Sequence, residues 1–293
     1  MAFLAGLAAA ACFGAQFAAG RQGAIAGLSP LDLVAIRFGT AAILMFPVLL
    51  WIGPSNLGGL GWKRGLALTA LAGAPYAFVV MLGVSWSNAV RASVLNPGLT
   101  PVAGAMLGWL LTRSRPTLRT VAGIVAILVG LGLVAGIDPR SEAPLPGDAI
   151  LAASACSYGL YAVLLARWQV NAIAATSTVC VLSAGICLPV HAIAAGGVGI
   201  LPGPICAMLL QAAVQGVLAG CIGTFLFAWA ASILGAGTAL LFPSLVPVFG
   251  VSIAVVALGE SLSPGQAIGV AIVSLGMAVA IRGRRVLVSP NTG

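Results

Sequence analysis

This sequence has very few charged side chains. Only 6% of its 293 residues are charged, with 13 Lys and Arg against 5 Asp and Glu. A soluble domain carries about a quarter charged residues, because it needs them for a surface that faces water. From Trp168 to Gly259 the chain has no Asp, Glu, Lys or Arg. An uncharged stretch of this length is too long to be the core of a soluble protein, so the solvent around it is expected to be lipid.

The scarcity of ionisable groups also limits the chemistry. An intramembrane serine protease needs a Ser paired with a His, and a metal site needs several His or acidic ligands. His191 is the only histidine, and the six cysteines lack metal-ligand spacing. We therefore predict that the chain is not an enzyme and that it has no catalytic residue, metal site or cofactor. The basic residues are scattered among short connections, so no nucleic-acid partner is expected.

Most of the chain consists of apolar runs, since 61% of the residues are hydrophobic. The 39 glycines and 17 prolines lie inside these runs. A spanning helix needs about 20 mostly apolar residues. We predict an all-α, multi-pass membrane protein, in a bacterial inner membrane, with a retained first helix. The ten expected transmembrane helices are 2–20, 31–52, 65–86, 90–111, 117–136, 148–166, 173–195, 207–231, 238–258 and 264–281. Loss of the break at 196–204 or 232–237 would reduce the count to nine.

Basic residues predict the orientation, because Lys and Arg concentrate in cytoplasmic connections. With an even number of helices, both termini share one side of the membrane. An N-in, C-in arrangement places nine bases inside and three outside. The inside set is Lys63, Arg64, Arg113, Arg115, Arg119, Arg167, Arg282, Arg284 and Arg285, and the outside set is Arg21, Arg91 and Arg140.

The sequence also aligns with itself at a shift of 146 residues. Pro97, Leu99, Pro101, Val102, Gly104, Gly123 and Gly130 then fall on Pro243, Leu245, Pro247, Val248, Gly250, Gly269 and Gly276. This match predicts two five-helix repeats, residues 1–146 and 147–293. Because five is odd, the second repeat must be inverted relative to the first, which is a plan common to secondary transporters.

Three ordered segments resemble the drug/metabolite transporter superfamily in its ten-helix, EamA-like form. They are Ser29-Pro30-Leu31 through Arg37-Phe38 to Ala41-Ala42, then Leu240 to Phe249, and then Leu258 to Ser263 with Gly269 and Gly276. The resemblance covers nearly the whole chain and implies a carrier of small molecules. The general form is similar to the YddG-type aromatic amino-acid exporters. The counterpart of Gly259-Glu260 in the first half reads Arg113-Ser114, where family members often repeat Gly-Glu. The small four-helix relatives use a buried membrane glutamate, which has no equivalent here.

Four prolines are candidate hinges. A proline inside a helix removes a donor and frees the carbonyl four residues earlier. Unpaired carbonyls are costly in lipid, so such segments should face protein or a wet cavity. The matched prolines Pro97, Pro101, Pro243 and Pro247 therefore indicate a central site, although they could instead only bend packed helices.

Polar and aromatic side chains at mid-depth are candidates for the cavity lining, because lipid-facing Tyr and Trp concentrate at the interfaces. The predicted substrate-binding residues are Gln16, Tyr76, Asn96, Tyr158, Tyr161, Trp229 and Phe242. For Arg37, a role toward a substrate carboxylate competes with satisfaction by carbonyls or reach to the outer interface, which we favour. For His191, packing or an interfacial position is favoured over proton transfer.

These features predict an alternating-access carrier that exports small organic molecules. Neutral hydrogen-bonding groups and aromatic faces suit amino acids, aromatic or otherwise neutral, and related amphiphiles. A carrier of nucleotide sugars or other metabolites would need several bases in its cavity, and a passive channel would show unitary currents. The expected partners are the small-molecule substrate and the lipid bilayer. With no carboxylate in the interior of an expected helix, we predict no obligatory proton coupling.

Overall fold

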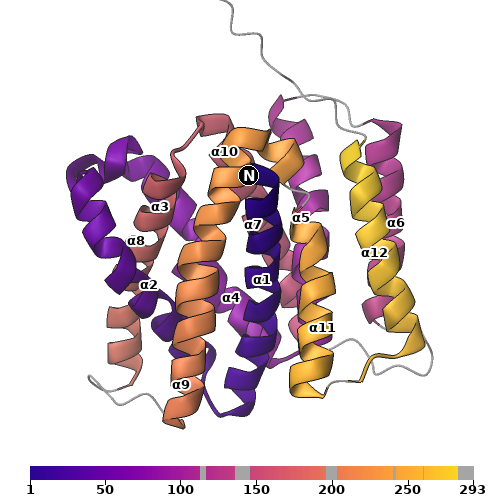
Figure 1. The fold of residues 1–293 in the computed structure, drawn as a ribbon, viewed down its shortest axis with the longest axis horizontal. Helices are drawn as coiled ribbons and strands as arrows, with labels where there is room; N and C mark the ends of the chain where they lie inside the picture. The colour runs from indigo at the N-terminus through magenta and orange to yellow at the C-terminus, as the bar shows by residue number, and fades with distance from the viewer. Residues whose placement is uncertain (113–116, 136–145, 196–202, 240–241, 260, 283–293) are drawn as a thin grey trace, which may run out of the picture.

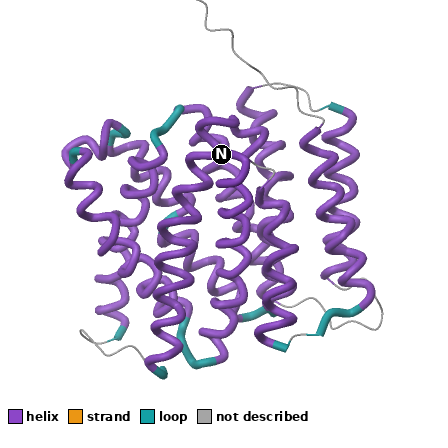
Figure 2. The backbone as a smooth tube through the Cα atoms, viewed as in Figure 1, coloured by secondary structure: helices purple, strands orange, loops and turns teal. Residues whose placement is uncertain are grey.

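The computed structural model describes residues 1–112, 117–135, 146–195, 203–239, 242–259 and 261–282. Within these ranges every regular element is a helix (Figures 1 and 2). In chain order they are α1 (Ala2–Ile25), α2 (Pro30–Ile52), η1 (Pro54–Gly59), α3 (Trp62–Ala72), α4 (Ala74–Ser85), α5 (Ala89–Thr112), α6 (Leu118–Ala135), α7 (Pro146–Trp168), α8 (Ala172–Ala194), α9 (Ile205–Gln211), η2 (Ala212–Gly223), α10 (Thr224–Ala239), η3 (Phe242–Leu245), α11 (Val246–Leu258) and α12 (Pro264–Arg282).

Six helical segments of the described chain are long and apolar enough to cross a membrane. They are Ala2–Ile25, Pro30–Ile52, Trp62–Ser85, Pro146–Leu165, Ala172–Ala194 and Ile205–Gly235. Three shorter apolar helices accompany them, at Leu118–Leu133, Val246–Leu258 and Pro264–Gly276. The all-helical membrane protein is confirmed, whereas the count of ten spanning helices and their orientation stay predictions. Several residues used for these predictions lie outside the described ranges, namely Arg113, Arg115, Arg140, Leu240, Leu241, Glu260, Arg284, Arg285 and most of the expected break at 196–204.

The expected helix 65–86 corresponds to the spanning segment Trp62–Ser85, which is divided into α3 and α4 at Gly73, just before Pro75. The break expected at 232–237 coincides with a kink at Gly235, where φ is 75° and the backbone is not helical, although the helical run resumes and continues to Ala239. Glycine reaches this left-handed region without the steric cost that a Cβ would bring, so the chain can bend there and resume its helix.

Local sequence signals explain where several helices begin. At the start of α2, Ser29 Oγ accepts a hydrogen bond from the Asp32 N–H, and Asp32 Oδ2 accepts one from the Ser29 N–H, at 3.1 and 2.8 Å. This reciprocal capping box satisfies two donors that a helix start leaves unpaired. Ser263 and Gln266 form the same box before α12. Asn171 caps α8 through its side-chain oxygen.

Small residues set the closest helix contacts. Helices α6 and α12 lie side by side at one edge of the bundle (Figure 1). A Cβ added at Gly130 would lie 2.7 Å from the Gly269 carbonyl oxygen, and one at Gly276 would lie 2.9 Å from that of Gly123. Backbones approach this closely in membranes because glycine has no side chain. Elsewhere α2 packs on α8, α5 on α7 and α1 on α11.

The surface of the bundle is apolar where the surface of a soluble protein would be polar. Large apolar side chains are exposed, with Trp51, Ile193 and Val256 each more than four-fifths accessible. Polar side chains lie inside, among them Arg91 and Gln215, which are essentially inaccessible. Exposed apolar surface on this scale is incompatible with water and suits lipid.

Candidate functional site

A partly open pocket with about 510 Å³ of empty space lies among the helices of the bundle. It is called the cavity below. Its walls come from eight of the helices and from η3, so it draws on both expected halves of the chain. Gln16 and Tyr158, from the middle of α1 and α7, place it well inside the membrane-spanning part. The lining residues are Phe13, Gln16, Phe17, Arg37, Ala72, Tyr76, Asn96, Pro97, Thr100, Tyr158, Thr224, Pro243 and Val246.

The structure brings six of the eleven sequence-predicted residues together at this cavity. These are Gln16, Tyr76, Asn96, Pro97, Tyr158 and Pro243. The other five, Pro101, Tyr161, Trp229, Phe242 and Pro247, are not among the lining residues.

Phe242 and Tyr161 show why residues at similar depth differ. The ring of Phe242 is buried against Gly6 and makes an edge-on contact with Phe3, at a centroid separation of 5.3 Å. Tyr161 is inaccessible, and its hydroxyl has no hydrogen-bond partner among the described residues. Both residues were candidates because aromatic side chains at mid-depth in a membrane are unusual. Whether such a side chain reaches the cavity depends on the side of its helix that faces the cavity.

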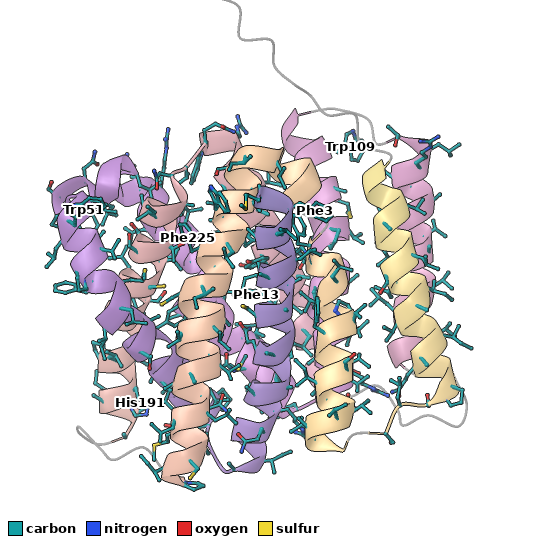
Figure 3. The ribbon with its side chains drawn as sticks, viewed as in Figure 1. Phe3, Phe13, Trp51, Trp109, His191 and Phe225 are labelled. Atoms are coloured by element: carbon teal, nitrogen blue, oxygen red, sulfur yellow. The ribbon has the colours of Figure 1, made fainter. Side chains whose placement is uncertain are left out.

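Aromatic rings form one wall of the cavity. The ring of Tyr158 lies 5.4 Å from that of Tyr76 and 6.3 Å from that of Phe13, measured between centroids. Phe13 projects from the middle of α1 in Figure 3. Such separations and tilted geometries are favourable for aromatic pairs. The wall therefore presents a continuous apolar face to any molecule that enters.

Asn96 ties three helices together behind this wall. Its Oδ1 accepts a hydrogen bond from the Tyr76 hydroxyl at 3.1 Å, and its Nδ2 donates to Ser154 Oγ at 2.6 Å. The side chain thereby joins α4, α5 and α7. Because Asn96 uses both ends of its amide for these bonds, it holds Tyr76 in position as well as lining the cavity.

Arg37 lines the cavity and does not reach the outer interface, one of the two positions that the sequence favours; the other, satisfaction by carbonyl oxygens, takes the form of side-chain amides. The side chain is only 6% exposed. Its Nη1 donates hydrogen bonds to Oε1 of Gln16 and, at 3.4 Å, to Oε1 of Gln215. The cation is thus held by two neutral amides deep in the bundle. This contact could not be predicted from the sequence, since Gln215 lies far along the chain in an apolar run.

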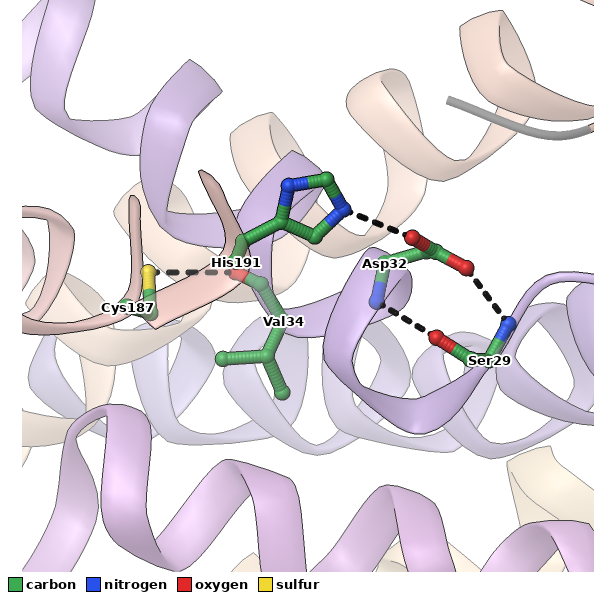
Figure 4. Close-up of polar contacts among 5 residues, drawn as sticks. All are labelled: Ser29, Asp32, Val34, Cys187 and His191. Atoms are coloured by element: carbon green, nitrogen blue, oxygen red, sulfur yellow. Dashed lines mark hydrogen bonds and ion pairs between the residues drawn. The ribbon is translucent and has the colours of Figure 1, made fainter. Parts of the chain in front are cut away.

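Two further polar pairs join helices of the bundle. His191 Nε2 and Asp32 Oδ1 are 2.7 Å apart and join α8 to α2, next to the capping box of Ser29 (Figure 4). In α5, Arg91 Nη1 lies 2.9 Å from Asp148 Oδ2 of α7. Arg91 is 1% exposed and lies in the first turn of α5, and its expected place on the outer side of the membrane stays a prediction. A guanidinium paired with a carboxylate is satisfied inside the protein and need not reach the interface.

The break between α3 and α4 lies beside the cavity residue Ala72. Pro75 cannot donate to the carbonyl of Leu71, and this oxygen instead accepts a hydrogen bond from Ser157 Oγ of α7 at 2.8 Å. The Ala74 N–H donates to Ser183 Oγ of α8 at 2.9 Å. Helices from the second half therefore satisfy the backbone groups that this break leaves unpaired, as a membrane interior requires.

Sequence reasoning did not select several lining residues. Phe13, Phe17, Ala72, Thr100, Thr224 and Val246 belong to this set. Thr100 and Thr224 turn their hydroxyls to backbone carbonyls of their own helices, at 2.8 and 3.0 Å. Polarity at mid-span was a usable signal for the two threonines. The apolar lining residues have no such signal in the sequence, because their helices are apolar on all sides.

Comparisons with known proteins agree with this architecture. The model of the EamA-like transporter family matches twice, over residues 1–136 and 145–282. A search of curated proteins found no match to this chain. Sixteen chains of solved structures match, and one of them, titled "Crystal structure of protein", is 22% identical with a TM-score of 0.67 over 98% of each chain. That likeness shows a shared fold. Since the two family matches together cover most of the chain, this protein belongs to the EamA-like transporter family, whose members are membrane transporters of small molecules.

Proposed function

We propose that this transporter is an inner-membrane carrier that exports amino acids, aromatic or otherwise neutral, and related amphiphiles. The cavity is the observation that carries the proposal, because residues from both family matches line it. Rocking of one half against the other would expose such a cavity to each side of the membrane in turn. In this scheme Gln16, Tyr76, Asn96 and Tyr158 form the substrate site, and the rings of Tyr161, Trp229 and Phe242 support it by packing. Pro97, Pro101, Pro243 and Pro247 act as hinges.

We also propose two inverted five-helix halves, residues 1–146 and 147–293, with both termini in the cytoplasm of a bacterium, and the glycine contacts support the inversion. Gly130 meets Gly269, and their repeat partners Gly276 and Gly123 meet in the same way. Reciprocal contact of this kind is what a two-fold axis between α6 and α12 produces. An axis that relates five helices to the next five lies in the membrane plane.

The chemistry of the cavity favours an amphiphile over a nucleotide sugar. Among the described residues Arg37 is the only base that lines it, and aromatic rings form another part of the lining. A diphosphate would need several cations to offset its charge. A small molecule with one polar end and one apolar body matches both walls.

We further propose that transport has no obligatory proton coupling. The carboxylates of the described residues, Asp32 and Asp148, are both bonded to a side chain of another helix, and neither lines the cavity. His191 is likewise engaged with Asp32. A coupling group must change protonation as the site alternates, so it would have to face the cavity.

Uptake into liposomes that contain the purified protein tests the proposal. The screen uses labelled phenylalanine, leucine and tryptophan, with protein-free liposomes as the control. We expect saturable uptake of at least one amino acid down its gradient, with no response to an uncoupler. Absence of flux for all three, with folded protein in the membrane, would contradict an amino-acid carrier.

A further inference from the structure

Arg37 is a buried cation that lacks a carboxylate partner among the described residues. The carboxylates of Asp32 and Asp148 are engaged with His191 and Arg91. Guanidinium groups stay protonated in proteins, so Arg37 carries a full positive charge inside the cavity wall. The nearby ring of Phe38, whose centroid is 5.4 Å from Arg37 Cζ, offsets only part of that charge.

The hydrogen bonds of Arg37 leave one edge of its guanidinium unused. Both bonds to the glutamine amides come from Nη1. Its Nε is buried without a hydrogen-bond partner among the described atoms. A guanidinium presents five donors in a planar fork that matches the two oxygens of a carboxylate. Two neutral amides can accept hydrogen bonds, but they cannot neutralise the charge.

Keeping an unneutralised cation in a membrane interior is costly, and such residues usually act on a substrate or an ion. An apolar replacement would remove this cost if Arg37 only filled space. The location is specific, since Arg37 lines the same cavity as Gln16 and the rings of Phe13, Tyr76 and Tyr158. An anion that enters this cavity would supply the missing charge.

We propose that Arg37 anchors the carboxylate of the transported molecule and makes the carrier selective for monocarboxylates with an apolar or aromatic body. This inference rests on the proposed function and names the substrate class of the same cavity. One base in the lining matches one negative charge, and the ring wall takes the remainder of the molecule. Gln16 and Gln215 hold the guanidinium in place while the cavity is empty.

The first experiment compares phenylalanine with phenylalaninamide, which has the same body without the carboxylate. In proteoliposomes, wild-type protein should prefer phenylalanine by about tenfold or more, as expected for a charge-assisted pair. Arg37→Gln should abolish this preference by raising the KM for phenylalanine, and Arg37→Lys should retain part of it as a point charge. Arg64→Gln is the matched control, because Arg64 is exposed and lies over Trp168, away from the cavity.

The second experiment changes charge without changing size. Gln16→Glu places a carboxylate beside Arg37 and should neutralise it internally, so the preference for phenylalanine should fall at least tenfold while the protein remains folded. Gln266→Glu is the isosteric control, because a glutamate at that position completes the capping box before α12. Its preference should equal that of the wild type.

A thermal-stability assay on purified protein separates this inference from the proposed function. A carboxylate that binds the folded state raises the Tm. Phenylalanine should raise the Tm of the wild type and of Gln266→Glu, but not that of Arg37→Gln. If no amino acid is transported while this carboxylate-specific shift is present, the carrier proposal fails and the anchor stands. Equal transport of phenylalanine and its amide by wild type, or an unchanged preference in both Arg37→Gln and Gln16→Glu, would overturn the anchor.

Discussion

Tyr158 contacts more aromatic rings than any other residue at the cavity. Its ring lies 5.3 Å from that of Tyr161 and 5.6 Å from that of Phe227, in addition to those of Tyr76 and Phe13. Tyr158 and Tyr161 are adjacent on one face of α7, yet only Tyr158 reaches the cavity. The two residues therefore offer a matched pair in which the same small change separates a role in binding from a role in packing.

Replacing each tyrosine with phenylalanine removes one hydroxyl and leaves the ring. Tyr158→Phe should alter the preference among transported molecules with little effect on thermal stability. Tyr161→Phe should leave transport unchanged and raise the free energy of unfolding by about 1 kcal/mol, because its buried hydroxyl has no partner to lose. Flux measurements and thermal unfolding in detergent check both. A changed substrate preference in Tyr161→Phe alone would contradict the assignment.

Residue types and depth could be predicted from the sequence, but contacts could not. Tyrosines and amides at mid-span stand out in the sequence, and six of the predicted residues line the cavity. The partners of Arg37 and His191 could not be predicted, because Gln215 and Asp32 are distant in sequence. A helix that is apolar on every side has no polar stripe to indicate its facing. Only packing against its neighbours decides which side chains turn inward.

At the scale of elements, the break between α3 and α4 depends on a serine from α7. Ser157→Ala should destabilise the protein by about 1 to 3 kcal/mol, because the Leu71 carbonyl would be left unpaired. In a Pro75→Ala background the restored N–H can reach that carbonyl, so the same change should cost little. Ser252→Ala serves as the control, since Ser252 is exposed and bonds only within its own helix. Thermal unfolding of the four combinations measures the coupling, and strict additivity would contradict it.

The matched prolines of the two halves occupy different structures. Helix α5 continues through Pro97 and Pro101, whereas Pro243 lies in η3 and Pro247 at the start of α11. The repeat in the sequence predicted the positions of these prolines, but not this asymmetry. Equivalent sequences can adopt different shapes when one conformation of an alternating carrier is observed, because the two halves then do not have identical surroundings.

Pro97→Ala and Pro243→Ala should each restore a backbone donor and stiffen a segment that lines the cavity. We expect transport to fall while expression and thermal stability hold or improve. Pro189→Ala is the control, because Pro189 lies inside α8 at an exposed position. Unchanged flux in both cavity variants would show that these prolines only shape the packing.

At the scale of the whole molecule, the arrangement in the membrane follows from the basic residues. Arg282, Arg284 and Arg285 cluster at the end of α12 and beyond it. Positive charge is retained on the cytoplasmic side. A fluorescent protein fused after Gly293 should therefore be cytoplasmic and fluorescent, whereas alkaline phosphatase at the same point should be inactive. The opposite pair of results, in a folded fusion, would overturn both the even helix count and the orientation.

Counterflow in proteoliposomes measures most directly whether the cavity works by alternating access. Liposomes loaded with excess unlabelled phenylalanine receive a trace of labelled phenylalanine outside, with equal pH on both sides. A carrier exchanges one molecule for another, so the label should accumulate transiently above its equilibrium level. His191→Gln should retain this overshoot, because its amide can still bond Asp32 and no proton transfer is required. Simple equilibration without an overshoot, or accumulation that requires a pH gradient, would contradict the account.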